Sequence, residues 1–329
     1  MTGVWPNSSV KRWAFCNGTS GPPLQIAMAQ CFAHPKCEPL NILKAAHVVP
    51  VLPNGVPQII HQTWKTKDLP EHWVPGSAAW RDLHSDWIYL MWTDADIEAY
   101  IETMWPQYQA LFAKLEHAIQ RVDLFRYFVL RDFGGLYCDL DIVAKNNVGP
   151  VLGTTPGNVF LVPSANTSGQ YTNALMVSTT APAAKAFWTS MIEYVEAFPS
   201  THADRVLSSV RHTRIVASTG PMALTRVAER SSVPVTVLPK KLWNPYELTV
   251  AGQLEHQTSP EALVYILQGS SWHAADSFVF VFLYTHRVPM IILAVLAIVW
   301  ILLQNAYLHD KASMLLRKLR RTRHNAVHA

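Results

Sequence analysis

The chain has 329 residues, half of them apolar, with 12 Trp and a formal net charge of +4. That apolar content can fill a sizeable core, which excludes a mainly disordered chain. Six of the 27 Lys and Arg lie in residues 309–329 beside one acid, which leaves 21 basic and 22 acidic residues elsewhere and gives no case for a nucleic-acid-binding body.

In chain order, residues 1–54 lack periodicity and predict an irregular N-terminal lead. Ile59 and Ile60 begin the first predicted strand, and residues 87–92 form the second, followed by a helix capped by Thr93 or Asp94. Further along, the patterns predict strands at 158–163, 174–178 and 233–239 and a helix at 182–198. Strands that alternate with helices indicate an α/β domain over 55–277 with a mainly parallel sheet.

The central stretch, 121–143, holds the strongest helical pattern. An apolar stripe recurs at spacings of three and four, through Ala118, Val122, Phe125, Val129 and Phe133. Asp123 and Arg126 fall off that stripe one turn apart, and their plainest interpretation is a surface ion pair. Gly134 and Gly135 then end the predicted helix.

A strand is predicted directly after the two glycines, from Leu136 to Val143. Its alternation places Asp139 and Asp141 on one face, roughly 6 to 7 Å apart between Cα atoms. Two such carboxylates raise each other's pKa unless a cation lies between them. Oxygen ligands suit Mn²⁺ or Mg²⁺, which would leave coordination sites for a diphosphate. The alternative is a solvated strand end.

The cysteines and the C-terminal end concern the compartment. No Cys-x-x-Cys pair occurs, which argues against zinc, and a disulfide among Cys16, Cys31 and Cys37 stays open. Residues 288–308 carry no formal charge and would form a helix roughly 31 Å long, so we expect a single transmembrane helix there, within a membrane-associated segment from 278. A buried helix of the core is the alternative.

Two rules disagree on the side of the membrane that holds the body. The basic tail, 309–329, points to the cytoplasm and the body therefore to the lumen. No N-terminal signal is visible in the sequence to carry the body there. The side of the catalytic domain is left open.

Five stretches, in this order, resemble the Asp-x-Asp sugar transferases of glycosyltransferase family 32. They are IIHQTWK (59–65), YLMWTDAD (89–96), RVDLFRYFVLRDFGGLYCDLD (121–141), STGPMALT (218–225) and GSSWHAAD (269–276). The likeness looks strongest to the mannosyl inositol phosphorylceramide synthases and the initiating α-1,6-mannosyltransferases. It implies a single nucleotide-sugar-binding domain of the GT-A type, with a C-terminal anchor added.

The resemblance also implies roles for residues. Asp139 and Asp141 would hold a metal–diphosphate, with His273 as a further metal ligand. Asp123 and Arg126 would contact the donor, and all four acidic and basic residues would count as catalytic. Further donor contacts are expected from His61, Gln62, Thr63, Trp64, Tyr137 and Asn173.

The implied activity is a retaining transfer of a hexose from a nucleotide sugar, with GDP-mannose favoured, to a membrane lipid such as inositol phosphorylceramide. The Golgi or another endomembrane is the expected place, and a regulatory membrane subunit is a further expected partner. A protein or N-glycan acceptor is the near alternative. A non-catalytic, membrane-anchored sugar-binding or regulatory subunit is the alternative from another class.

Overall fold

The computed structural model describes residues 36–46, 48–165, 169–248, 254–256, 260–267, 291–292 and 294–302. Within them, the main sheet has the strand order β2-β1-β3-β6-β5-β7. These strands are β1 (Ile59–Trp64), β2 (Ile88–Thr93), β3 (Gly135–Cys138), β5 (Val159–Pro163), β6 (Tyr171–Ser178) and β7 (Val235–Val237). β6 runs antiparallel to both β3 and β5, and the other pairs are parallel. The sheet is therefore mixed, with one predominant direction as predicted.

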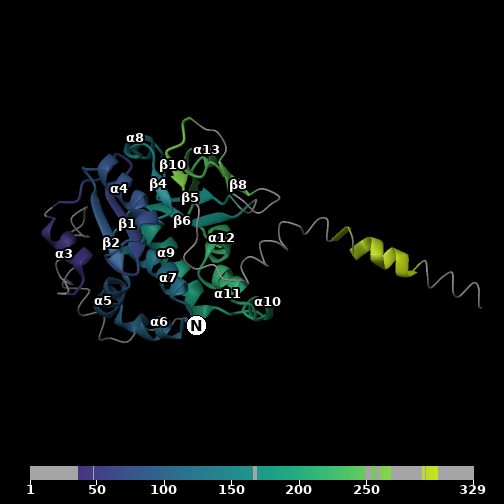
Figure 1. Ribbon diagram of the computed structural model, residues 1–329. Helices are drawn as coiled ribbons and strands as arrows, with labels where there is room; N and C mark the ends of the chain where they lie inside the picture. Colours follow the sequence, from purple (N-terminus) through teal and green to yellow (C-terminus); the bar gives the residue numbers. More distant parts are fainter. Residues whose placement is uncertain are drawn as a thin grey trace, which may run out of the picture. The chain divides into compact units, whose positions relative to one another are not determined.

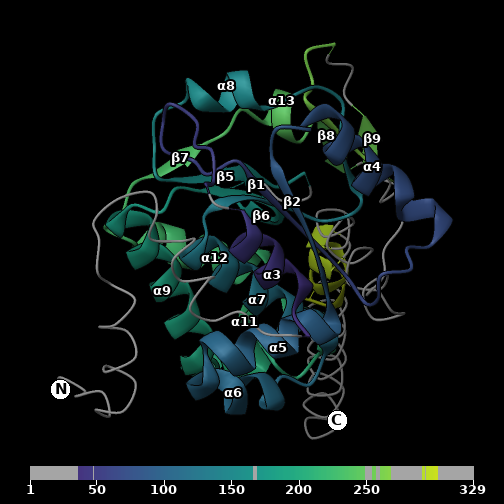
Figure 2. The same cartoon turned by 90° about the vertical axis from the view of Figure 1, so that its left-hand side faces the viewer.

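Helices cover both faces of this sheet (Figures 1 and 2). The larger layer contains α3 (Glu38–Ala45), α5 (Asp94–Met104), α6 (Gln109–Lys114), α7 (Ala118–Asp132), α9 (Pro182–Ala197), α10 (His202–Leu207), α11 (Arg211–Ser218) and α12 (Pro221–Arg230). The other contains α4 (Val74–Leu83), α8 (Gly149–Gly153) and α13 (Lys240–Trp243). Two 3₁₀ turns, η1 (Glu71–Trp73) and η2 (Pro106–Tyr108), precede α4 and α6. Small antiparallel pairs join β4 (Ile142–Ala144) to β10 (Val264–Ile266) and β8 (Tyr246–Leu248) to β9 (Leu254–His256).

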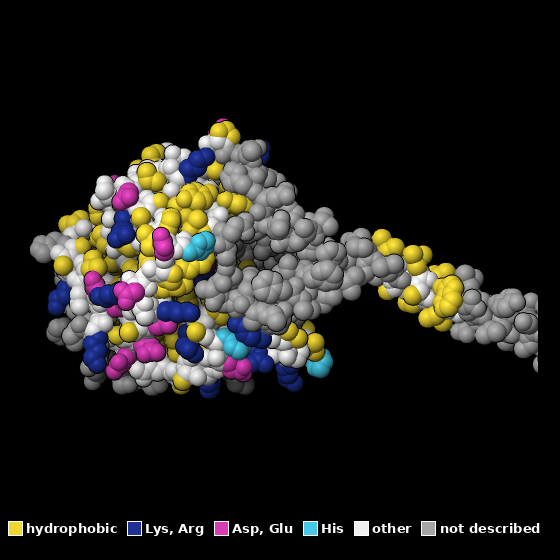
Figure 3. All heavy atoms as spheres, in the orientation of Figure 1, with side chains coloured by type: hydrophobic (Ala, Val, Ile, Leu, Met, Phe, Trp, Pro, Cys, Tyr) yellow, Lys and Arg dark blue, Asp and Glu magenta, His cyan; other side chains and the backbone are white. Residues whose placement is uncertain are grey.

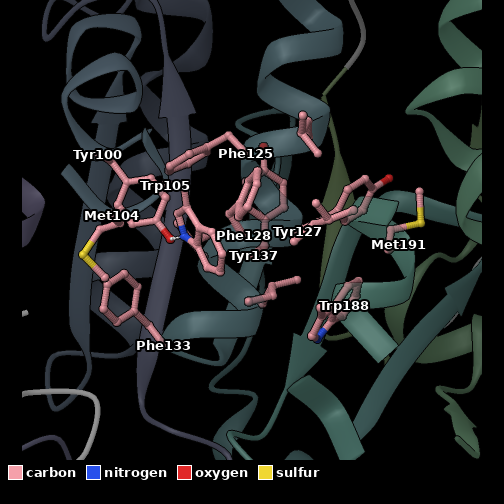
Figure 4. Close-up of a cluster of buried hydrophobic side chains, with 14 of the residues drawn as sticks. Tyr100, Met104, Trp105, Phe125, Tyr127, Phe128, Phe133, Tyr137, Trp188 and Met191 are labelled. Carbon is pink, nitrogen blue, oxygen red and sulfur yellow. Dashed lines mark hydrogen bonds between the residues drawn. The ribbon is translucent and has the colours of Figure 1, made fainter. Parts of the chain in front are cut away.

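The alternation of strand residues creates two apolar clusters. Ile59 packs with the larger helical layer, while Ile60 packs on the opposite face. Around α7 the larger cluster is rich in aromatic rings, which converge from several helices (Figure 4). α7 is consequently buried nearly all round, and its polar residues must find partners inside the protein.

Local signals placed several helix ends correctly. Thr93 caps α5 as expected: its hydroxyl accepts from Asp96 N, and the Asp96 carboxylate accepts from Thr93 N. Gly134 and Gly135 follow α7 with φ of 62° and 86°, and they end that helix as predicted.

Part of the predicted irregular lead is helical. In α3, Leu40 and Leu43 are buried in the larger cluster, and Cys37 just before the helix is buried with them. The three-residue spacing of the two leucines suits one helix face, a signal that the proline- and asparagine-rich context obscured. Cys37 is a free thiol, while Cys16 and Cys31 lie outside the described residues.

The apolar C-terminal segment belongs to a separate unit of the chain. Residues 291–292 and 294–302 are helical and exposed, with Ile291 at 60% and Leu302 at 61%. In the part of the chain that the structure describes, no helix is long and apolar enough to cross a bilayer. The rest of the predicted 288–308 span, the segment 278–285 and the tail 309–329 lie outside the described residues.

Candidate active site

The Asp-x-Asp pair lies on a turn. Asp139 N donates to Ala174 O at 2.8 Å, and Ile142 N donates back to Asp139 O at 3.0 Å, which closes the turn. β3 ends at Cys138, and the chain resumes as β4, which pairs with β10 in a different sheet. The prediction of one continuous strand from Leu136 to Val143 is therefore wrong. The period of two was real, but the backbone partners change in its middle.

The two glycines fix the position of this turn relative to β1. A Cβ on Gly135 would lie 2.5 Å from Ile59 O, so β3 approaches β1 more closely than a side chain allows. The parallel register then sets Tyr137 beside His61. Two residues further along each strand, Asp139 comes level with Thr63 at the same edge of the sheet.

Arg126 lies at the centre of the site. Its Nη2 contacts Asp123 Oδ1 at 3.0 Å and Asp139 Oδ1 at 3.4 Å, and its Nη1 donates to Asn173 O at 2.6 Å. The guanidinium also lies 4.6 Å from the centre of the Tyr137 ring. The pair predicted at i,i+3 exists, but its side chains are only 2% and 5% exposed. The surface ion-pair interpretation is therefore wrong, because α7 has no solvent-facing side here.

Asp123 lies behind Arg126. Its carboxylate accepts from Asn173 Nδ2 at 2.9 Å and from Thr219 Oγ1 at 3.0 Å. Burial raises its pKa to about 7, although the charge of Arg126 opposes that shift. Asp123 and Asn173 are buried and do not line the pocket described below. Within the described residues, Asp123 and Asn173 contact Arg126 and hold it in position, and neither faces the pocket.

Tyr137 joins the two strands below the turn. Its hydroxyl donates to Asp139 Oδ1 at 2.8 Å and lies 3.0 Å from Thr63 Oγ1, which therefore donates to it. The ring is fully buried. Tyr137 thus positions Asp139 from beneath, with Arg126 above the ring.

Asp141 differs from Asp139 in its contacts. Its Oδ1 is buried and has no hydrogen-bond partner among the described residues. Burial raises its pKa to about 7, and the charge of Asp139 adds to the shift. A buried carboxylate oxygen without a hydrogen-bond partner is stabilised when a cation binds to it.

A pocket of about 390 Å³ opens beside these residues. α7 forms one wall with Ala118, Ile119, Val122 and Arg126. The remaining lining comes from β1, η1, α5, the turn and α11: Thr63, Trp64, Lys65, Trp73, Asp94, Glu116, His117, Asp139, Leu140, Asp141 and Arg211. The volume lies in the range of small-molecule sites.

The four residues His61 to Trp64, expected to contact the donor, all belong to β1, whose side chains point alternately to its two faces. Thr63 and Trp64 line the pocket, but His61 and Gln62 do not. His61 is buried; its Nδ1 accepts from Trp92 Nε1, and its Nε2 donates to Gly134 O. Burial lowers the pKa of His61 to about 4. Gln62 Oε1 accepts from Tyr89, and its amide reaches Asp139 O at 3.4 Å.

Several residues of the site were not singled out by the sequence. Thr219 holds Asp123, and its carbonyl accepts from Tyr127 at 2.6 Å. It lies in the noted stretch STGPMALT, which was the one signal available. Trp73, His117 and Arg211 line the pocket from distant parts of the chain, and no local pattern indicates that.

The carboxylate oxygens of the site fit a hard divalent cation whose remaining coordination positions are filled by a bound phosphate and water. No group of three or more His, Cys, Asp or Glu able to hold a metal occurs in the described ranges. Asp139 and Asp141 supply carboxylate oxygens, and one of these oxygens has no other partner. Mg²⁺ characteristically binds through one or two carboxylates together with phosphates and water. His273 lies outside the described residues.

Comparison with known proteins agrees with the resemblance. Residues 70–157 match the family described as "Glycosyltransferase sugar-binding region containing DXD motif", which confirms the predicted relationship. The mannosyl phosphorylinositol ceramide synthase CSH1 of Saccharomyces cerevisiae is 42% identical over 30% of this chain and 27% of its own length. Inositol phosphoceramide mannosyltransferase 3 of Schizosaccharomyces pombe is 29% identical over 70% of this chain and 60% of its own length.

The chain thus spans less than two thirds of the length of these two relatives. Among solved structures, the PaToxG glycosyltransferase is similar at 14% identity and a TM-score of 0.39, over 53% of this chain and 69% of that one.

Proposed function

We propose that the chain is a metal-dependent, retaining mannosyltransferase of the GT-A type, which moves mannose from GDP-mannose to an inositol phosphoceramide at an endomembrane such as the Golgi. The observation that carries this is the buried Arg126, shared by Asp123 and Asp139 at the wall of a pocket that Asp141 also lines. The names of the relatives support the sugar and the acceptor.

The residues divide into those that meet the donor and those that hold them. Arg126, Asp139 and Asp141 line the pocket where the diphosphate would lie, and Trp64 offers a face to the base. Asp123, Asn173 and Tyr137 keep Arg126 and Asp139 in place. A cation held by Asp139 and Asp141 would act there as a Lewis acid toward the diphosphate.

Arg126 contributes charge at the point where the leaving group gains it. The bond between mannose C1 and the phosphate oxygen breaks, and an acceptor hydroxyl bonds to C1 from the same face. The hydroxyl proton passes to the departing diphosphate. Because Arg126 is buried and its partners are fixed, it needs no reorganisation during the step.

The test measures nucleotide release and mannose transfer by the full chain, with Mn²⁺, a panel of nucleotide sugars, and lipid or glycan acceptors. We expect transfer from GDP-mannose to inositol phosphoceramide, with an α-anomer in the product by NMR. Asp141→Asn should lower transfer by about 100-fold or more, while the exposed Asp82→Asn should leave it unchanged. Absence of release with every donor, or equal activity of Asp141→Asn, contradicts the proposal.

A further inference from the structure

The pocket has two charged ends separated by an apolar stretch. Its α7 wall runs from Ala118 to Arg126, which is about 12 Å along the helix axis. Arg126, Asp139 and Asp141 form one end, and Ala118, Ile119 and Val122 line the middle. The other end is formed near the start of α7, where Glu116, His117 and Arg211 line the pocket. A second anionic group therefore has a place away from the donor diphosphate.

The first turn of α11, which begins with Arg211, is held at this end by contacts of Arg214. Arg214, one turn further along α11, forms an ion pair with Glu116, which also lines the pocket. Arg214 Nε donates to Ser208 O at 2.7 Å, which fixes the connection from α10. The first turn of α11 is thus fastened both to the pocket rim and to α10.

The segment leading into Arg211 presents apolar and basic groups to solvent. We call residues 202–211 the α10–α11 elbow. Val206 is 59% exposed and Val210 is 46% exposed, and His202 and Arg205 are exposed beside them. Yellow, blue and cyan side chains, with a magenta group beside them, gather at the lower right of the coloured part of the molecule in Figure 3.

The acid of the elbow is turned inward. Asp204 is 5% exposed, caps α10 through Thr201 and pairs with Arg226 at 3.0 Å. The outward surface of the elbow is therefore apolar and positive. Such a combination favours the interface of an anionic bilayer, where valines enter the head-group region and arginines meet phosphate.

From this arrangement we propose that the α10–α11 elbow contacts the bilayer and that Arg211 binds the phosphate of the acceptor lipid's head group. The inference rests on the proposed function and specifies its acceptor side. A guanidinium can bind a phosphate through two parallel hydrogen bonds. The head-group ring would then lie between Arg211 and the donor end, with a hydroxyl directed toward the donor sugar.

The test uses the full chain in mixed micelles with GDP-mannose and two acceptors. One is inositol phosphoceramide; the other is glycerophosphoinositol, which keeps phosphate and inositol but has no tails. Arg211→Gln should raise the KM of both acceptors about tenfold or more, since a charge-assisted contact is lost. Arg211→Lys should recover part of the loss, and the exposed Arg230→Gln on α12 is the matched control.

The elbow is tested by the double variant Val206→Asp with Val210→Asp. It should raise the apparent KM for the micellar lipid about tenfold and leave that for glycerophosphoinositol unchanged. Val237→Asp, at a valine of similar exposure on β7, is the control. Val206→Ser alone serves should the double variant melt at a lower temperature.

Donor readouts separate the two proposals. GDP-mannose hydrolysis without acceptor, and the KM of the donor, should stay at wild-type values in all these variants. A raised donor KM in Arg211→Gln would overturn the acceptor assignment, as would equal effects of the elbow variant on both acceptors or on neither. Wild-type transfer by both Arg211→Gln and the elbow variant overturns this inference alone, whereas neither hydrolysis nor transfer by the wild-type chain overturns the proposed function as well.

Discussion

The two halves of α7 each bury an aspartate, but the two carboxylates have different surroundings. Asp132, near the C-terminal end, accepts from Tyr100 at 2.6 Å, from Trp105 at 2.8 Å and from Arg131 at 2.8 Å. Figure 4 shows Tyr100 and Trp105 among the aromatic rings of the core. Asp123, two and a half turns earlier, shares Arg126 with Asp139 beside the pocket.

Burial of an acid is therefore no mark of a functional site by itself. Asp132 accepts hydrogen bonds from donors that belong to the core, and none of these partners among the described residues lines the pocket. The contacts of Asp123 lead through one cation to a second carboxylate and then to open space. We expect substitutions around Asp132 to affect stability and substitutions around Asp123 and the pocket to affect activity.

The largest effect should come from the pocket end. Asp141→Asn keeps the shape of the side chain and removes the charge of a carboxylate whose buried Oδ1 has no hydrogen-bond partner among the described residues, so no bond to that oxygen is lost. We expect transfer to fall by about 10² to 10³-fold, the usual loss for one electrostatic contact to a reacting group. Steady-state kinetics and a melting curve measure this, and a melting temperature that falls along with activity would contradict the division.

The next effect concerns pH at the core end, where His61 donates to Gly134 O. The folded pKa of about 4 lies below the ordinary value of 6.5, so between these values the unfolded chain binds a proton that the folded chain does not. Stability should consequently fall as pH drops from 6.5 to 4. His61→Gln should lessen that fall by about 3 kcal/mol.

Urea unfolding across this pH range measures the difference, with the exposed His202→Gln as the control. An unchanged pH slope in His61→Gln would show that the ring is not kept neutral by burial.

Asp132→Asn should act on stability alone. Its carboxylate accepts from three donors and is 1% exposed, so the amide loses charge-assisted bonds worth about 1.5 to 3 kcal/mol. Urea unfolding should show this loss. The kcat and donor KM of the folded fraction should equal those of the wild type, and a large fall in kcat would place this end in the catalytic machinery.

The smallest effect is expected from Trp64, which is partly exposed at the pocket wall. Trp64→Ala should raise the donor KM by up to about tenfold, because one aromatic stacking contact contributes about 0.5 to 1.5 kcal/mol beyond area. The KM of the acceptor should not change. Isothermal titration with GDP separates this loss from any effect on transfer.

The sequence predicted best where the cause was local. Thr93 and Gly134 delimit helices through hydrogen bonds and dihedral angles that neighbouring residues alone determine. The main strands were found for the same reason. What local patterns could not give was the pairing of β4 with β10, 120 residues away, and hence the turn that carries Asp139 and Asp141.

Of the residues that the sequence singled out, some line the pocket and others are buried behind it. Arg126, Asp139, Asp141, Thr63 and Trp64 line the pocket, whereas Asp123, Asn173 and Tyr137 lie behind them. Helical periodicity identifies a face of α7 but not what covers it, and Asn173 of β6 covers this one. The same reasoning explains Arg211, which reaches the pocket from a separate helix.

The close approach at Gly135 fixes the register of β3 against β1, and so fixes which residues the two strands bring to the edge of the sheet. Both start from the contact between Gly135 and Ile59, and four residues later one reaches Asp139 and the other Thr63. The Tyr137 hydroxyl joins these two positions, because it contacts both Thr63 and Asp139. A residue inserted into either strand would shift one strand against the other, and Asp139 would then lose its contacts with Tyr137 and Arg126. This part of the chain can therefore vary in side chains far more readily than in length.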